Sequence, residues 1–124
     1  MTAAAESSAG SPIAFLGTGL LGSALVEAAA GRGERVAVWN RTAAKARALA
    51  PLGVRVGDTP ADAVRGAARV HLVLRDDDVV EEVLAAARPG LAPDAIVVDH
   101  TTTQPARTAA RAERLAREGV RYLH

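Results

Sequence analysis

The sequence contains no cysteine, 2% aromatic residues and a single lysine, Lys45. Without cysteine there is no disulfide, thiolate zinc site or cysteine nucleophile, and nothing marks an oxidising compartment. Few aromatic side chains are available to stack on the bases of single-stranded nucleic acid. The formal net charge of +1 implies neither a nucleic-acid partner nor an anionic membrane surface. We therefore expect a cytoplasmic protein.

Long apolar runs are also missing. None approaches the roughly 20 residues of a membrane-spanning helix, and residues 1–11 lack the basic start and apolar stretch of a signal peptide. The 124 residues suit one domain, and a 49% apolar content is enough for a core. We expect residues 1–11 to be a disordered tail, residues 12–124 to form one domain, and no membrane partner.

Short apolar runs alternate with segments of helical spacing. The runs predict strands at residues 12–16, 35–39, 54–56, 69–74, 96–99 and 120–123. Several are continuously apolar, which is typical of strands covered by helices on both faces. The alternation predicts an α/β, Rossmann-type, doubly wound and mainly parallel sheet in the order 3-2-1-4-5-6. We expect helices to be capped by Thr42, Asp76 and Thr103.

A glycine-rich turn follows the first expected strand and opens a helix. It reads Gly17-Thr18-Gly19-Leu20-Leu21-Gly22. Gly17 permits a sharp turn, Gly19 lets a pyrophosphate approach the backbone, and Gly22 lets the helix pack close to the strand. The free N–H groups and positive dipole end of the helix attract phosphate. An ordinary strand-to-helix loop is the alternative, but the position between two strands favours dinucleotide binding.

The end of the second expected strand indicates which dinucleotide. NAD-binding folds place an Asp or Glu here on the ribose 2′-hydroxyl, whereas this chain has the neutral Asn40. Arg41 and Thr42 supply a guanidinium and a hydroxyl that suit a phosphate, and Lys45 adds a second cation one helical turn later. Alone, the two cations also fit a solvated helix start. Together with the missing acid they predict NADP(H) as the cofactor.

Residues 13–22, 38–45 and 97–105, in this order, resemble the β-hydroxyacid dehydrogenases. That family includes 3-hydroxyisobutyrate and 6-phosphogluconate dehydrogenases, glyoxylate and succinic semialdehyde reductases, and the related imine reductases. The resemblance implies that Leu74 and Arg75 line the cofactor, with Arg75 standing where the family has proline. It also places Thr101, Thr102 and Thr103 beside substrate and nicotinamide, Thr102 contacting the cofactor as well. Helix capping is the alternative for these threonines.

No catalytic residue is assigned. The family continues past the sixth strand into a helical domain that supplies the catalytic lysine and the dimer interface, and we expect that domain to be absent from this chain. Lys45 falls at the adenosine end, and a structural role is favoured for His100, which follows the fifth strand.

Two charged runs fit structural roles. Residues 76–78 are three acids that match helix caps and dipole partners, so no metal is assigned to them. Arg107, Arg111 and Arg114 share one helical face, which we interpret as solvated because acids are interspersed.

These observations leave function classes open. The favoured one is the NADP(H)-binding domain of an oxidoreductase that transfers hydride to or from a small hydroxyacid, semialdehyde or imine. Substrate would then bind only with a second domain, in a full-length parent that forms a homodimer. The alternative is a stand-alone NADPH-binding module or redox sensor without catalysis, so enzyme activity of this chain stays undecided. A methyltransferase is less favoured, because Asn40 does not supply the acid that holds its ribose.

Overall fold

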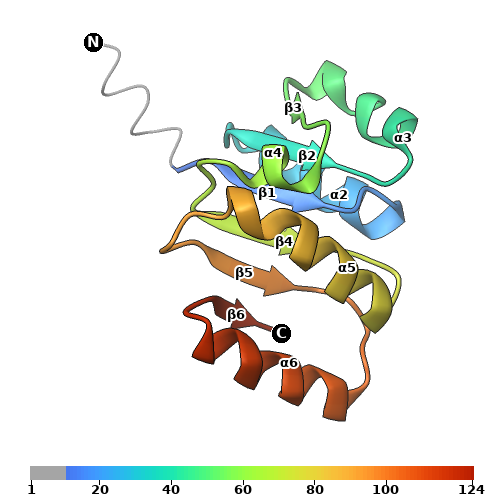
Figure 1. Cartoon of the computed structure of the whole chain (residues 1–124). Coiled ribbons are helices and arrows are strands. Elements are labelled where there is room, and N and C mark those ends of the chain that lie inside the picture. The colour runs from blue at the N-terminus through green and yellow to red at the C-terminus, as the bar shows by residue number, and fades with distance from the viewer. Residues whose placement is uncertain (1–10) are drawn as a thin grey trace.

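The computed structural model describes residues 11–124, and within them six parallel strands form one sheet in the order β3-β2-β1-β4-β5-β6 (Figure 1). The strands are β1 (Ile13–Leu16), β2 (Val36–Trp39), β3 (Arg55–Val56), β4 (Arg69–Leu72), β5 (Ile96–Asp99) and β6 (Arg121–Leu123). This topology confirms the predicted Rossmann-type fold. β4 ends at Leu72 instead of residue 74, because the chain leaves the sheet there to reach the next helix. The expected tail lies outside the described residues except for Ser11.

Helices cover both faces of the sheet. They are α2 (Leu20–Gly31), α3 (Ala43–Arg47), α4 (Pro60–Val64), α5 (Asp77–Ala87) and α6 (Pro105–Arg117), with short 3-10 helices η1 (Ala50–Leu52) and η2 (Arg88–Gly90). In Figure 1, α4 and α5 lie in front of the sheet and α2 lies behind it. None of the helices within residues 11–124 is both long and apolar enough to cross a bilayer.

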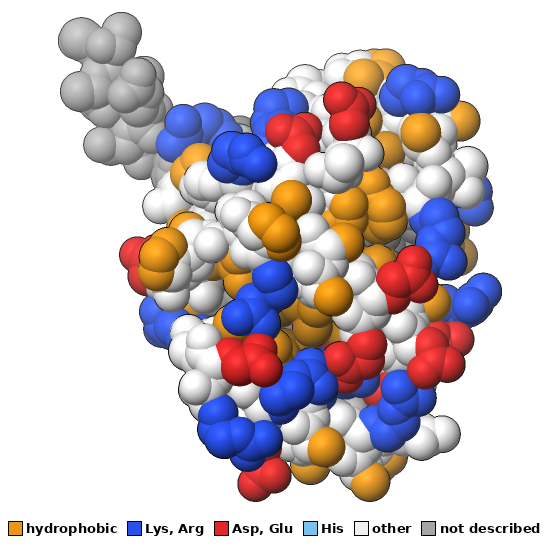
Figure 2. Space-filling view, in the orientation of Figure 1, with side chains coloured by type: hydrophobic (Ala, Val, Ile, Leu, Met, Phe, Trp, Pro, Cys, Tyr) orange, Lys and Arg blue, Asp and Glu red, His pale blue; other side chains and the backbone are white. Residues whose placement is uncertain are grey.

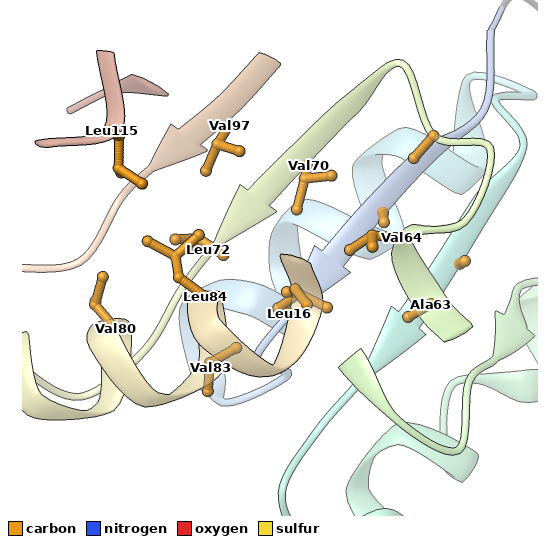
Figure 3. Packing of buried hydrophobic residues seen from close by; sticks show 14 residues of the cluster. Leu16, Ala63, Val64, Val70, Leu72, Val80, Val83, Leu84, Val97 and Leu115 are labelled. Carbon is orange, nitrogen blue, oxygen red and sulfur yellow. The ribbon is translucent and has the colours of Figure 1, made fainter. Parts of the chain in front are cut away.

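The core has two halves, because successive strand residues point to opposite faces. Toward α4, α5 and α6, the strands contribute Leu16, Leu72 and Val97, which pack with Val80 and Leu115 (Figure 3). The opposite half, toward α2 and α3, gathers Ile13, Phe15, Val36, Val38, Val26, Ala29 and Ala46. Burying each large apolar side chain contributes about 1.5–3 kcal/mol. The continuous apolar runs of β1 and β2 follow from this two-sided cover.

A buried ionic group joins α5 to α6. The side chain of Arg111 is 0% exposed, with its Nη2 2.6 Å from Asp77 and its Nε 2.8 Å from Glu81. The interpretation of Arg107, Arg111 and Arg114 as a solvated face is therefore wrong for Arg111. The acids of α5 neutralise its guanidinium, which lets it be buried. The two outer arginines form half-exposed pairs with Asp78 and Glu81. Basic and acidic side chains accordingly alternate over this part of the surface in Figure 2.

The helix starts match the expected caps in one case of three. Asp76 caps α5, its Oδ1 accepting from the Val79 N–H at 3.1 Å. Thr42 occupies the N-cap of α3, but its hydroxyl accepts no capping hydrogen bond. The prediction for Thr103 is wrong, since Gln104 is the N-cap of α6. The Thr103 hydroxyl is instead engaged with Thr108 and His124.

Candidate functional site

A cavity of about 540 Å³ opens beside the carboxyl ends of the strands, the end to which the arrows point in Figure 1. It lies between β1 and β4, where the order of the strands reverses, which is the usual ligand position in doubly wound folds. The expected site residues that line it are Gly17, Gly19, Leu20, Leu21, Gly22, Asn40, Arg41, Lys45, Leu74, Arg75 and Thr102. Expected site residues outside its lining are Thr18, Thr42, Thr101 and Thr103.

The three glycines of the turn meet three different surroundings. Gly17 has a φ of +105°, and a Cβ there would lie 2.1 Å from the carbonyl oxygen of Val73. A Cβ on Gly22 would lie 2.2 Å from the carbonyl oxygen of Gly17, so α2 packs directly on the turn. A Cβ on Gly19 would meet no atom within 4 Å and would enter the cavity. Gly19 thus leaves open a cradle that a ligand can approach.

The start of α2 suits an anion. Its N-cap is Gly19, with no side-chain capping bond and no acid in the first turn, so the helix dipole is unopposed there. Among the described residues, the Thr18 hydroxyl is buried without a hydrogen-bond partner. Its backbone N–H donates to Asn40 Oδ1 at 2.8 Å, and its carbonyl accepts from the Ser23 hydroxyl at 2.8 Å. The turn is therefore held in place while its cavity side stays available to a diphosphate.

One end of the cavity carries two cations, Arg41 and Lys45. Arg41 and Lys45 both line it, and Arg41 Nη2 lies 2.8 Å from Glu82 Oε2 on α5. Asn40 also lines it, but its amide is used within the protein, accepting from Thr18 and donating to the Thr42 carbonyl at 3.1 Å. The sequence indicated that Asn40 replaces an acid, and the structure adds that it ties the glycine turn to the end of β2.

Side chains that the sequence did not single out complete the cavity. Val79 and Val83 of α5 and Trp39 of β2 line it. The two valines stand one helical turn apart, a spacing that also describes ordinary core residues. Periodicity alone therefore gave no reason to assign them to a ligand site.

A chain of hydrogen bonds supports the end of the cavity that is lined by Leu74 and Thr102. Leu74 N–H donates to the Thr101 hydroxyl at 3.0 Å, and Thr101 N–H donates to Asp99 Oδ1 at 2.9 Å. Tyr122 donates its phenol proton to Asp99 Oδ2 at 2.6 Å. Burial, followed by the Asp99 carboxylate, raises the pKa of Tyr122 to about 12. Thr101 is buried because its hydroxyl serves this chain, which leaves Thr102 to face the cavity.

His100 also lines this end, and its imidazole is held by a second histidine. Arg69 Nε–H donates to His71 Nε2 at 2.8 Å, so the His71 proton resides on Nδ1. That Nδ1 lies 2.9 Å from His100 Nε2 and donates to it. Burial, together with the charges of Arg69 and His100, lowers the pKa of His71 to about 4. His71 is thus neutral at pH 7, and the hydrogen bond between the two histidines uses only Nε2 of His100 and not its Nδ1.

Comparison with known proteins identifies the family. Residues 12–124 match the model of the NAD binding domain of 6-phosphogluconate dehydrogenase. The NADPH-dependent reductive aminase of Aspergillus oryzae is 31% identical over 112 residues, which are 90% of this chain and 38% of the aminase. The cytokine-like nuclear factor N-PAC of Xenopus tropicalis is 32% identical over 114 residues, 90% of this chain and 21% of that protein.

A solved structure agrees with these relatives. The imine reductase from Myxococcus stipitatus in complex with NADP+ superposes with a TM-score of 0.83 at 30% identity, over 90% of this chain and 39% of the reductase. The chain therefore spans well under half the length of the relatives it matches. The resemblance inferred from its motifs is confirmed: the chain belongs to the family of the NAD binding domain of 6-phosphogluconate dehydrogenase.

Proposed function

We propose that this chain is the NADP(H)-binding domain of an oxidoreductase that transfers hydride to or from a small substrate, with imines as the favoured class. The observation that carries the proposal is the cavity in which an open Gly19 and the uncapped α2 adjoin Arg41 and Lys45. Two relatives are named for NADPH-dependent amine formation and for imine reduction, which supports both cofactor and substrate class.

Each part of the cavity has a role in this proposal. The N–H groups at the start of α2 hold the diphosphate, with Gly19 giving access to the backbone. Arg41 and Lys45 bind the 2′-phosphate, while the partly buried Val79 offers apolar contact to the adenine. The bound nicotinamide supplies the hydride. Thr102 and His100 orient the nicotinamide, and the imidazole of His100 can exchange a proton with the substrate.

A titration with NADPH and NADH tests the cofactor assignment. Wild type is expected to bind NADPH more tightly. The Arg41→Ala substitution should lower the affinity of the protein for NADPH about tenfold, because a charged hydrogen bond to phosphate is lost. It should change the affinity for NADH less than about twofold. Arg117→Ala, on exposed α6 surface, is the matched control. Equal or tighter binding of NADH by wild type contradicts the proposal.

An NADPH-binding module without catalysis is the second candidate. One relative, N-PAC, matches over 90% of this chain and is named as a nuclear factor and not as an enzyme, which favours this candidate. In addition, no aspartate or glutamate is among the described residues that line the cavity. Loss of NADPH absorbance with a small cyclic imine, measured for the full-length protein and its His100→Ala variant, separates the two candidates, because substrate is expected to bind only with a second domain. Turnover that His100→Ala diminishes supports catalysis, and tight NADPH binding without turnover supports the module.

A further inference from the structure

The cation expected to bind the 2′-phosphate already has an anionic partner. Arg41 Nη2 lies 2.8 Å from Oε2 of Glu82, which is 41 positions further along the chain. Arg41 follows β2 and Glu82 belongs to α5, so the pair joins two elements at the rim of the cavity. Both side chains are exposed, at 55% and 66%. An approaching ligand can therefore reach and separate them.

The placement of Glu82 on α5 is specific. Val79 and Val83, on either side of it within one helical turn, line the cavity. The neighbouring Glu81 points instead to α6, where it pairs with Arg111 and Arg114. Of the two adjacent acids, Glu82 alone pairs with the guanidinium of Arg41, which borders the cavity.

From this geometry we infer that Glu82 is a specificity-determining residue, an internal anion that competes with the cofactor's 2′-phosphate for Arg41. The inference rests on the proposed function, because it concerns the same site. The 2′-phosphate must displace the Glu82 carboxylate and then remain close to a like charge. An exposed ion pair is weak, so the phosphate prevails at some loss of affinity.

The same residue has no such effect on NAD(H). The adenosine ribose of NAD(H) has a 2′-hydroxyl, which carries no charge, so the Arg41–Glu82 pair can persist when NADH is bound. Lys45 makes no ion pair within the described residues and remains a second cation for the phosphate. Glu82 therefore narrows the preference for NADP(H) without abolishing it.

Glu82→Gln tests the inference, with Glu113→Gln as the matched control. The control removes one exposed acid from α6 and gives the same change in net charge. At low ionic strength, Glu82→Gln should tighten NADPH binding by about threefold to tenfold, with NADH binding changed less than about twofold. Glu113→Gln should leave both affinities within about twofold of wild type. The gain should shrink with added salt, because screening weakens a charge effect and leaves a packing effect intact.

The possible failures are distinguishable. If wild type binds NADPH but Glu82→Gln leaves its affinity unchanged or weaker, the inference is overturned and the proposed function stands. If wild type binds neither dinucleotide, the proposed function itself fails. Equal thermal melting of the two glutamine variants establishes that both are folded, and in an Arg41→Ala background the gain should be smaller because no guanidinium is left to release.

Discussion

Gly19 and Gly22 stand in one turn, yet an added methyl group has opposite consequences at the two positions. At Gly22 it collides with the backbone of Gly17, whereas at Gly19 it enters open space. The motif predicted both residues, since spacing and type suffice to recognise the turn. It did not predict that Thr101 is buried, because that depends on the Leu74 N–H, which comes from the segment after β4, 27 positions away.

Alanine substitutions separate folding from binding at these two glycines. Gly19→Ala should change the unfolding free energy by no more than about 1 kcal/mol and weaken NADPH binding at least about tenfold, because its methyl group obstructs the diphosphate. Gly22→Ala should cost about 2 kcal/mol of stability through overpacking. Urea unfolding and a dinucleotide titration of each variant measure both effects. Unchanged NADPH affinity in Gly19→Ala is the result that contradicts the placement of the diphosphate.

At the scale of elements, α5 and α6 dock through charge as well as through apolar contact. Arg111 is buried against Asp77, and that contact lowers the pKa of the Asp77 carboxyl, with help from the Gln104 N–H. Local periodicity predicted that both helices exist. It gave the wrong environment for Arg111, because a row of arginines on one helix looks the same whether water or acids of another helix lie opposite. Asp77 is 34 positions away, and its pairing is a tertiary feature.

Removing the buried guanidinium should loosen this pair of helices. Arg111→Met is expected to lower the unfolding free energy by about 3 kcal/mol, because it leaves acids without their counter-charge in a buried place. Arg117→Met, on the exposed side of α6, should change it by less than about 0.5 kcal/mol. Chemical denaturation measures both. Adding Asp77→Asn to Arg111→Met should recover part of the loss, and a failure to recover any of it would show that lost packing, not charge, dominates.

At the scale of the whole molecule, the cavity draws on both halves of the sheet. The segments that follow β1 and β2 supply the glycine turn with Arg41 and Lys45, and the segments that follow β4 and β5 supply the opposite side. The strand order and position of the cavity were predictable from alternation and one motif, because parallel crossovers allow few topologies. The side-chain contacts within each half were not predictable. Asn40 to Thr18 and His71 to His100 are contacts between segments distant in sequence.

The stability of the whole domain should depend on pH through His71. Its pKa in the folded state is about 4 against the ordinary 6.5, mainly because of burial, with Glu34 opposing the shift. As pH falls below about 6.5 the unfolded chain takes up a proton that the folded protein refuses until about pH 4. The contribution of His71 to the free energy of unfolding is therefore complete above about pH 6.5 and declines between about pH 6.5 and pH 4. The decline is on the order of 1 kcal/mol, because the group is partly exposed. Urea unfolding at pH 7 and pH 5 measures the decline, which His71→Gln should reduce and His124→Gln should not.

The near absence of lysine has a practical consequence. Lys45 is the single lysine of the sequence, and it borders the cavity. This sequence therefore carries one ε-amine. An amine-selective fluorophore can be attached at the mouth of the cavity in the unmutated protein. The labelled molecule would report through its own emission whether that mouth is filled.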